Sequence, residues 1–135
     1  MESEALANRI AQLAIEALAT DIVILDLRAL SDVVDFFVIV SGKSNVHLDA
    51  IAVGIDRGTR ATSGVSAYHR EGETGSHWIL LDYIDVVVHI FMPATRQFYA
   101  LEDLWGDAPI LRVEAPRLTP EGYDEYGPGE DNGDI

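Results

Sequence analysis

The stretch FFVIVSG, residues Phe36–Gly42, constrains the fold of this chain more than any other. Apart from its last two residues it is entirely apolar, so a strand formed here has two buried faces and lies inside a sheet. A second stretch rich in β-branched residues, Asp21–Leu27, precedes it. Helical periodicity before residue 21 and after residue 44 predicts helices that can cover such a sheet. The sequence therefore predicts helices packed on one mixed sheet.

The rest of the body of the chain reads as alternating helices and strands. Ser44 stands where a helix N-cap is expected, and Pro93 stands where a helix begins. The predicted helices cover 5–19, 45–61 and 93–105, and the remaining predicted strands lie near 66–70, 76–83 and 85–92. The order α-β-β-α-β-β-β-α predicts a single α/β (α+β) domain over 1–113, with a mixed five-stranded sheet and flanking helices.

From residue 114 the composition changes. The stretch 114–135 contains seven acidic residues, one arginine, three prolines and four glycines. Chains of this composition cannot bury enough apolar surface to fold. We therefore expect an acidic, disordered tail.

Charge and cysteine content exclude several classes of function. The net charge is −14 and Lys43 is the only lysine, so binding to a nucleic-acid backbone, which needs clustered positive charge, is not expected. Basic protein partners are favoured instead. The chain has no cysteine, which excludes thiolate metal sites and disulfides. No signal peptide or membrane span is visible, so a cytoplasmic protein is expected.

The tripeptide Gly42-Lys43-Ser44 matches the end of a phosphate-binding P-loop. The full motif needs a second glycine five residues before Gly42, and Phe37 stands there. A bulky residue within an apolar strand cannot form the phosphate-binding loop. The interpretation is that Gly42 turns the chain and Ser44 caps the following helix.

A strand followed by a small-residue turn and a helix also begins the nucleotidyltransferases. Such an enzyme needs carboxylates that converge on Mg²⁺. The acids available are Asp49, Asp82 and Asp85, and no D-x-D pair lies on a strand after Gly42. A degenerate, nucleotide-binding relative without catalytic acids stays open as the alternative function.

No metal site or nucleophile emerges from the remaining motifs. The four histidines lack the spacing of a zinc motif, and no nucleophile elbow is present. No cofactor and no enzymatic activity are expected. The histidines are His47, His69, His77 and His89.

The segment Trp78–Phe91 is read as a hairpin whose strands carry large side chains on both faces. Trp78, Leu80 and Asp82 share one face, and the residues between them share the other. Either helices cover both faces, or one face is a surface for a partner protein.

Three motifs in order give the chain a resemblance to a known family. They are D-x-F-V-I-x-S-G-x-S from Asp35, W-x-L-L-D-Y-x-D-V-V-V-H from Trp78, and R-x-F-Y-x-L-E-x-L-W from Arg96. From residue 5 to 108 the sequence resembles the ribosomal silencing factor family, also called RsfS or Iojap-like.

The resemblance implies a fold related to the nucleotidyltransferases without their catalytic acids. It also implies a repressor of translation under nutrient limitation. Such a factor binds the fourteenth protein of the large ribosomal subunit and blocks joining of the small subunit. The contact surface it implies is centred on the hairpin, with the residues Trp78, Leu81, Asp82, Tyr83, Asp85 and His89. Phe98, Tyr99 and Trp105 match the family as well and are interpreted as helix packing.

The hairpin turn departs from the family pattern. Ile84 stands where the family usually has glycine, and a β-branched residue resists positive φ. We therefore expect a turn of another type. The sequence leaves open whether the chain forms a homodimer.

Overall fold

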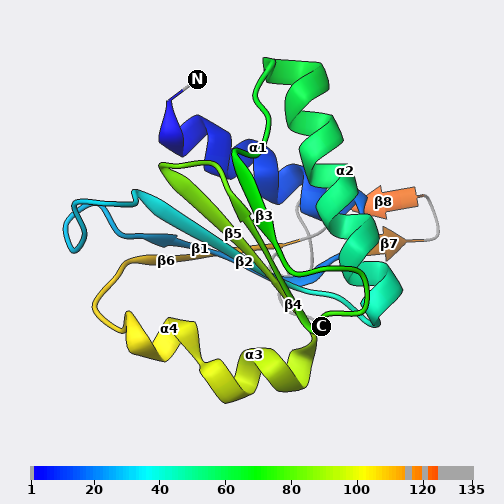
Figure 1. Ribbon diagram of the computed structural model, residues 1–135. Coiled ribbons are helices and arrows are strands. Elements are labelled where there is room, and N and C mark those ends of the chain that lie inside the picture. Colours follow the sequence, from blue (N-terminus) through cyan, green and yellow to red (C-terminus); the bar gives the residue numbers. More distant parts are fainter. Residues whose placement is uncertain (1, 115–116, 120–121, 125–135) are drawn as a thin grey trace.

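The structure, a computed structural model, describes residues 2–114, 117–119 and 122–124. Its centre is a six-stranded sheet of order β3-β4-β5-β2-β1-β6 (Figure 1). Only β2 and β5 pair in parallel; the other neighbours are antiparallel. The strands are β1 (Thr20–Asp26), β2 (Phe36–Ser41), β3 (His69–Glu71), β4 (Trp78–Asp82), β5 (Val86–Phe91) and β6 (Ile110–Val113). The predicted α+β class and mixed sheet are confirmed.

The strand count of five was wrong, because the sheet has a sixth strand. β6 was not predicted, since its four residues follow a proline and include an arginine. It pairs with β1, with Ile24 opposite Leu111. Thus β6, rather than β1, is the edge of the sheet.

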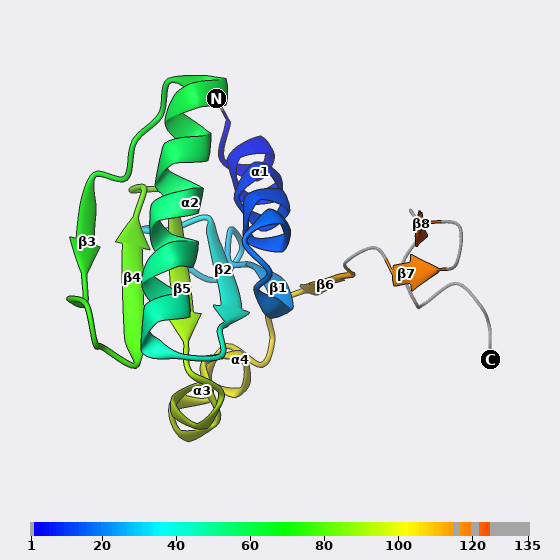
Figure 2. The same cartoon turned by 90° about the vertical axis from the view of Figure 1, so that its right-hand side faces the viewer.

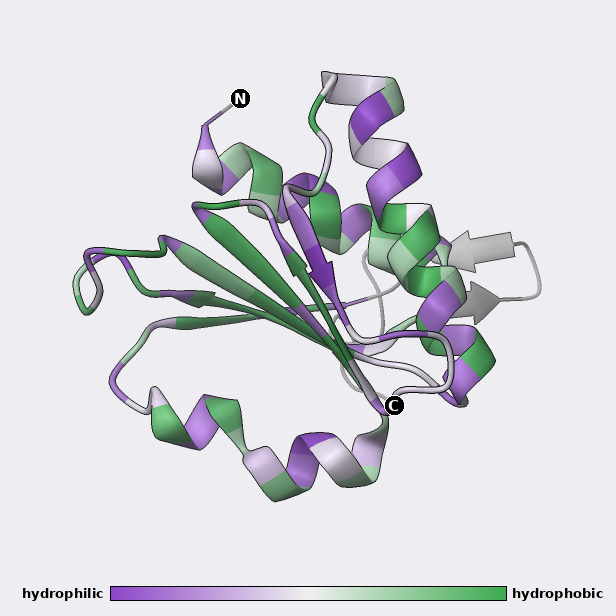
Figure 3. Ribbon diagram, in the orientation of Figure 1, coloured by the Kyte–Doolittle hydropathy of each residue, from purple (hydrophilic) through white to green (hydrophobic). Residues whose placement is uncertain are grey.

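Two helices cover one face of the sheet, which we call the helix face. They are α1 (Ser3–Glu16) and α2 (Asn45–Ser63), and Figure 2 shows them side by side over the strands. The apolar side of each helix, including Ile10, Ile51 and Ile55, is fully buried there, over strands that are mainly hydrophobic (Figure 3). The Ser44 hydroxyl accepts a hydrogen bond from the His47 N–H at 3.1 Å, so the predicted N-cap is confirmed.

The two helices approach each other most closely at glycine. A Cβ on Gly58 would overlap the Leu13 side chain of α1, whereas one on Gly54 would meet Ala17 at an ordinary 3.7 Å. Gly58 is therefore required by packing, and Gly54 is not.

The opposite face is covered by residues 93–108, which we call the α3–α4 strap (Figure 1). A single helix was expected over 93–105. Instead α3 (Pro93–Tyr99) and α4 (Leu101–Leu104) are separated by Ala100, whose φ of 48° ends α3. Leu101, Trp105 and Ala108 pack on the sheet core of this face, which contains Val23, Leu25, Leu27, Ile39 and Phe91. We call this side the strap face.

Arg96 fastens the strap to the ends of two central strands. Its guanidinium donates to the Asp21 carbonyl at 2.6 Å and to the Ser41 hydroxyl at 2.9 Å. It also donates to the Glu102 carboxylate at 2.7 Å. This one largely buried side chain therefore joins α3, α4, β1 and β2.

The predicted disordered tail, 114–135, lies mostly outside the described residues. Its described part forms a short antiparallel pair, β7 (Arg117–Thr119) with β8 (Gly122–Asp124). Within the described residues, no helix combines the length and apolarity that a membrane crossing requires.

Candidate partner-binding surface

The turn after β2 is built for packing and not for phosphate. A Cβ on Gly42 would lie 2.7 Å from the Leu48 side chain, so this glycine lets α2 pack closely against the strand end. The Ser41 hydroxyl accepts from Arg96, and Ser44 caps α2. The small residues of the turn are therefore all engaged within the domain.

The three acids of the nucleotidyltransferase alternative do not converge. Asp49 on α2 accepts from Arg70 at 2.8 Å on the helix face. Asp82 lies on the strap face, opposite His69, and Asp85 is exposed at the end of the hairpin. The sheet therefore stands between Asp49 and Asp82. Among the described residues, no group of three or more acidic or histidine side chains is arranged to hold a metal ion.

The six residues predicted as partner contacts are divided by the sheet. Leu81 and Tyr83 are buried on the helix face, so they are not available as surface contacts. The sequence predicted that these two residues share one face of the strand. It did not predict that the long helices cover this face. Trp78, Asp82 and His89 lie on the strap face.

Tyr83 is held inside the helix-face core by a directional hydrogen bond. The Thr59 hydroxyl donates to the Asp56 carbonyl at 3.1 Å, so it has no second proton for Tyr83. The Tyr83 hydroxyl must therefore donate to Thr59, at 2.9 Å. Burial is the main cause that raises the pKa of Tyr83 to about 12.

Trp78 and His89 form the centre of an aromatic cluster on the strap face. The Trp78 indole N–H donates to Nδ1 of His89 at 3.2 Å. The Trp78 ring lies 4.8 Å from the Phe91 ring, and Phe37 meets His89 edge-on at 4.5 Å. Trp78 is only half-buried, so the cluster reaches the surface through this residue.

His89 supports the cluster from beneath. It is 5% exposed, and burial lowers its pKa to about 4, so the ring is neutral at pH 7. Because Nδ1 accepts from Trp78, the proton is assigned to Nε2. That buried nitrogen has no hydrogen-bond partner, which leaves the ring held only by Trp78 and by aromatic packing.

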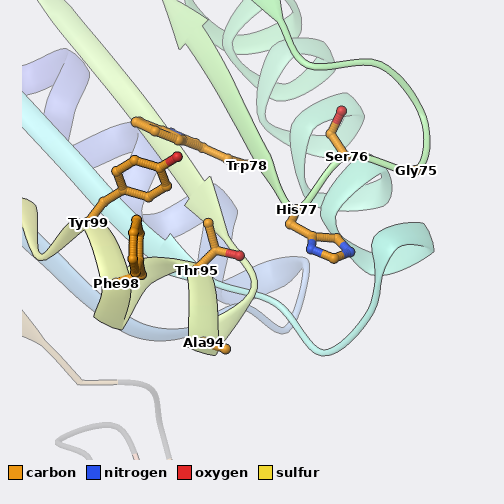
Figure 4. A pocket seen from close by; sticks show the side chains of 8 residues that line it. All are labelled: Gly75, Ser76, His77, Trp78, Ala94, Thr95, Phe98 and Tyr99. Carbon is orange, nitrogen blue, oxygen red and sulfur yellow. The ribbon is translucent and has the colours of Figure 1, made fainter.

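The strap adds two exposed aromatic side chains to Trp78. The Tyr99 ring lies 4.7 Å from Trp78, and Phe98 meets Tyr99 edge-on at 5.0 Å (Figure 4). We call Trp78, Phe98 and Tyr99 the aromatic patch. The three line a shallow hollow of about 610 Å³ with Gly75, Ser76, His77, Ala94 and Thr95.

Interpreting Phe98 as helix packing was wrong, since the residue is 80% exposed. The break at Ala100 resets the helical phase, so Phe98 and Leu101 do not share one buried stripe. Nothing in the sequence signals this break, because neither glycine nor proline stands at it. Trp105, by contrast, packs edge-on against Phe37 at 6.1 Å, as predicted.

Three acidic side chains lie on β4, after the hairpin turn and on α4. Asp82 is half-buried on the strap face of β4, and Asp85 and Asp103 are exposed. None of the three pairs with an arginine or lysine within the described part of the chain. Unpaired carboxylates on a domain with a net charge of −14 suit a basic partner protein.

The hairpin turn has the positive φ that glycine would favour, although a β-branched residue stands at this position. Ile84 has a φ of 77°, and the Asp85 N–H donates back to the Tyr83 carbonyl at 3.0 Å. The Asp82 carboxylate accepts the Ile84 N–H at 2.7 Å. These two bonds hold a β-branched residue in a conformation it resists.

Comparison with known proteins gives a consistent result. A family described as "Ribosomal silencing factor during starvation" matches residues 1–129. The ribosomal silencing factor of Bacillus subtilis is 40% identical over 96 residues, which is 71% of this chain and 80% of the relative. The ribosomal silencing factor of Halalkalibacterium halodurans is 37% identical over 107 residues, which is 76% of this chain and 91% of the relative.

Solved structures share the fold. A crystal structure from Chromobacterium violaceum superposes with a TM-score of 0.74 and 32% identity, covering 78% of this chain and 88% of that one. A crystal structure from Bacillus halodurans superposes with a TM-score of 0.70 and 30% identity, covering 82% of this chain and all of that one.

Proposed function

The chain belongs to the ribosomal silencing factor (RsfS, Iojap-like) family, and from this premise we propose that it binds the large ribosomal subunit and blocks joining of the small subunit. Members of the family are named as silencing factors, which are regulators and not enzymes. The proposed contact is the fourteenth protein of the large subunit, and the proposed effect is repression of translation when nutrients are limited. The chain would act in the cytoplasm, where the subunits join.

The aromatic patch carries this proposal. Trp78, Phe98 and Tyr99 offer rigid apolar surface of the kind that anchors protein interfaces. Asp82 lies on the same face of β4 as Trp78, and the net charge of the chain is −14, which favours encounter with a basic ribosomal protein.

The buried members of the predicted contact set have a supporting role in this proposal. His89 holds the Trp78 indole through its hydrogen bond. Leu81 and Tyr83 fix β4 against the helices on the other face. Substitutions at these three positions would therefore act on binding by displacing the hairpin.

Occlusion requires no chemistry from the bound domain. A folded domain seated on the intersubunit face occupies the space that the small subunit needs. Silencing then depends only on the affinity for the large subunit and on the position of the bound domain.

The test is sedimentation of purified subunits with the protein, in magnesium that favours joining. We expect the protein to travel with the large subunit and the joined peak to fall. Replacing a central aromatic anchor weakens binding by about 2–4 kcal/mol, or about 30- to 1,000-fold. Phe98→Ala is the informative variant, because an exposed side chain can be removed without loss of core packing.

Tyr68→Ala is the matched control, because Tyr68 is also an exposed aromatic residue but lies outside the patch. If Phe98→Ala and Trp78→Ala both bind like the Tyr68 variant, the patch is not the contact surface. If the parent protein stays at the top of the gradient, the proposed function is refuted. The protein sedimented alone reports whether it is a homodimer.

A further inference from the structure

The two edges of the sheet differ in how well they are protected. Edge strands offer unpaired backbone groups, and proteins usually blunt them with charge or by keeping them short. β3 consists of three ionisable residues, His69–Glu71. β6 carries one charge, Arg112, and its Ile110 and Leu111 are 40% and 55% exposed. The β6 edge is therefore open to another strand.

The register shows which backbone groups of β6 face outward. The Asp26 N–H donates to the Pro109 carbonyl at 3.0 Å, so these two residues form a hydrogen-bonded pair. Bonded and non-bonded pairs alternate along an antiparallel ladder. Ile24 and Leu111, two residues further along each strand, are opposite each other and are therefore also a bonded pair.

It follows that Ile110 and Arg112 direct their N–H and C=O groups away from β1. The pairing of β1 with β2 leads to the same assignment. The Leu27 N–H donates to the Asp35 carbonyl on the β2 side, so Asp26 and Ile24 direct their backbone groups toward β6. Among the described residues, no backbone partner meets the outward groups of Ile110 and Arg112. Two donors and two acceptors are thus aligned for a further strand.

A cavity of about 210 Å³ lies beside this edge on the helix face. Its floor is apolar and includes Ala7, Ile24 and Phe36, while Glu4 and Asp26 carry carboxylates at its rim. On an added strand, the residue opposite Leu111 would project from the same face, next to the cavity. A lysine or arginine fits such a place, with its aliphatic stem on the floor and its charge at the rim.

Charge selects the occupant of the edge. Arg28 already bridges Asp26 and Glu4, yet one cation faces two carboxylates there. A second copy of the chain would bring another net charge of −14, which opposes self-pairing at this edge. We propose that β6 accepts an extended, lysine- or arginine-containing segment of a partner protein as a seventh strand.

This site is separate from the aromatic patch. The patch is built on β4 and the strap, whereas β6 is at the other end of the strand order. The proposal goes beyond silencing, and either surface can fail its test while the other passes.

The test uses a seven-residue peptide of alternating lysine and valine as the probe. Amide hydrogen exchange is followed by NMR on the full chain with and without saturating peptide. We expect the Ile110 and Arg112 amides to exchange about tenfold more slowly, or slower still, when the peptide is bound. The Leu111 amide already bonds to β1 and serves as the internal control.

Two substitutions at one position separate backbone pairing from charge. Arg112→Ala and Arg112→Pro have the same net charge, but only proline lacks the outward N–H. An outward N–H is not needed by the existing ladder, so proline is tolerated there. We expect Arg112→Ala to bind the peptide at least as tightly as the parent does, and Arg112→Pro to bind about tenfold more weakly than Arg112→Ala. Protection of the Leu111 amide checks that β6 stays paired.

The proposal is overturned if both variants bind equally, because the association is then electrostatic only. It is also overturned if the peptide does not bind, or binds without slowing exchange at Ile110. A homodimer that Arg112→Pro dissociates would assign the edge to a second copy. Subunit sedimentation with Arg112→Pro reports separately on the proposed silencing function.

Discussion

We expect acid to destabilise this domain through His89 in particular. Its folded-state pKa is about 4, whereas an exposed histidine of the unfolded chain has a pKa of about 6.5. The unfolded state therefore binds this proton more tightly, so the stability is full above pH 6.5 and is lost as the pH falls toward 4.

The size of the loss follows from the difference between the two pKa values. It amounts to about 2 kcal/mol at pH 5 and about 3 kcal/mol at pH 4. The physical cause is burial beneath Trp78 and Phe37, where a charged ring would have no water and no carboxylate partner.

The matched variant is His89→Gln, whose side-chain oxygen can still accept the Trp78 indole N–H. Urea unfolding of both proteins, followed by circular dichroism between pH 4 and 8, gives the free energy of unfolding of each. All other titrating groups are common to both, so the difference between the two curves isolates His89. A difference that stays constant from pH 8 to pH 4 would refute the reasoning.

Three further predictions concern stability measured by thermal or urea unfolding. Ile84→Gly raises the stability by about 1 kcal/mol, because Ile84 is exposed and held at positive φ; a loss would mean that its side chain makes contacts we have not recognised. Gly58→Ala lowers the stability by about 1–3 kcal/mol, because the added methyl group overlaps Leu13. Gly54→Ala in the same helix raises the stability by up to about 1 kcal/mol. Equal effects of the two substitutions would contradict the close approach of the helices at Gly58. Tyr83→Phe lowers the free energy of unfolding by about 1 kcal/mol at pH 7, because the hydrogen bond to Thr59 is lost. In the parent, the stability should fall as the pH rises from 10 to the folded-state pKa of Tyr83, about 12. The variant should lack this fall, and an equal fall in both proteins would assign the titration to another group.

The central part of the fold was predictable because local pattern and tertiary role agree there. The apolar run beginning at Phe36 is a central strand between β5 and β1, and alternation assigned Trp78 and Tyr83 to opposite faces. Ser44 lies at a helix start that its side chain stabilises. Each of these signals depends only on residues that are close together in the sequence.

What the sequence did not predict depends on distant partners. β6 is a strand because β1 offers it an edge, and Ala100 adopts positive φ within a helical pattern. Tyr83 is buried on the helix face, where it bonds to Thr59 of α2, while the short strap leaves Phe98 exposed. Which face of the hairpin is exposed therefore depends on the lengths of other elements, because α2 is long and the helices of the strap are short.

The α3–α4 strap has a consequence for the cooperativity of unfolding. Neither of its helices contains a fully buried residue, and its attachment rests on Arg96 and on a few side chains such as Trp105. Segments with little buried apolar surface open at a fraction of the global free energy of unfolding. We therefore expect the strap to behave as a separate foldon that detaches while β2, α1 and α2 stay native, so that strap amides exchange first and the Phe91 side of the sheet is briefly uncovered.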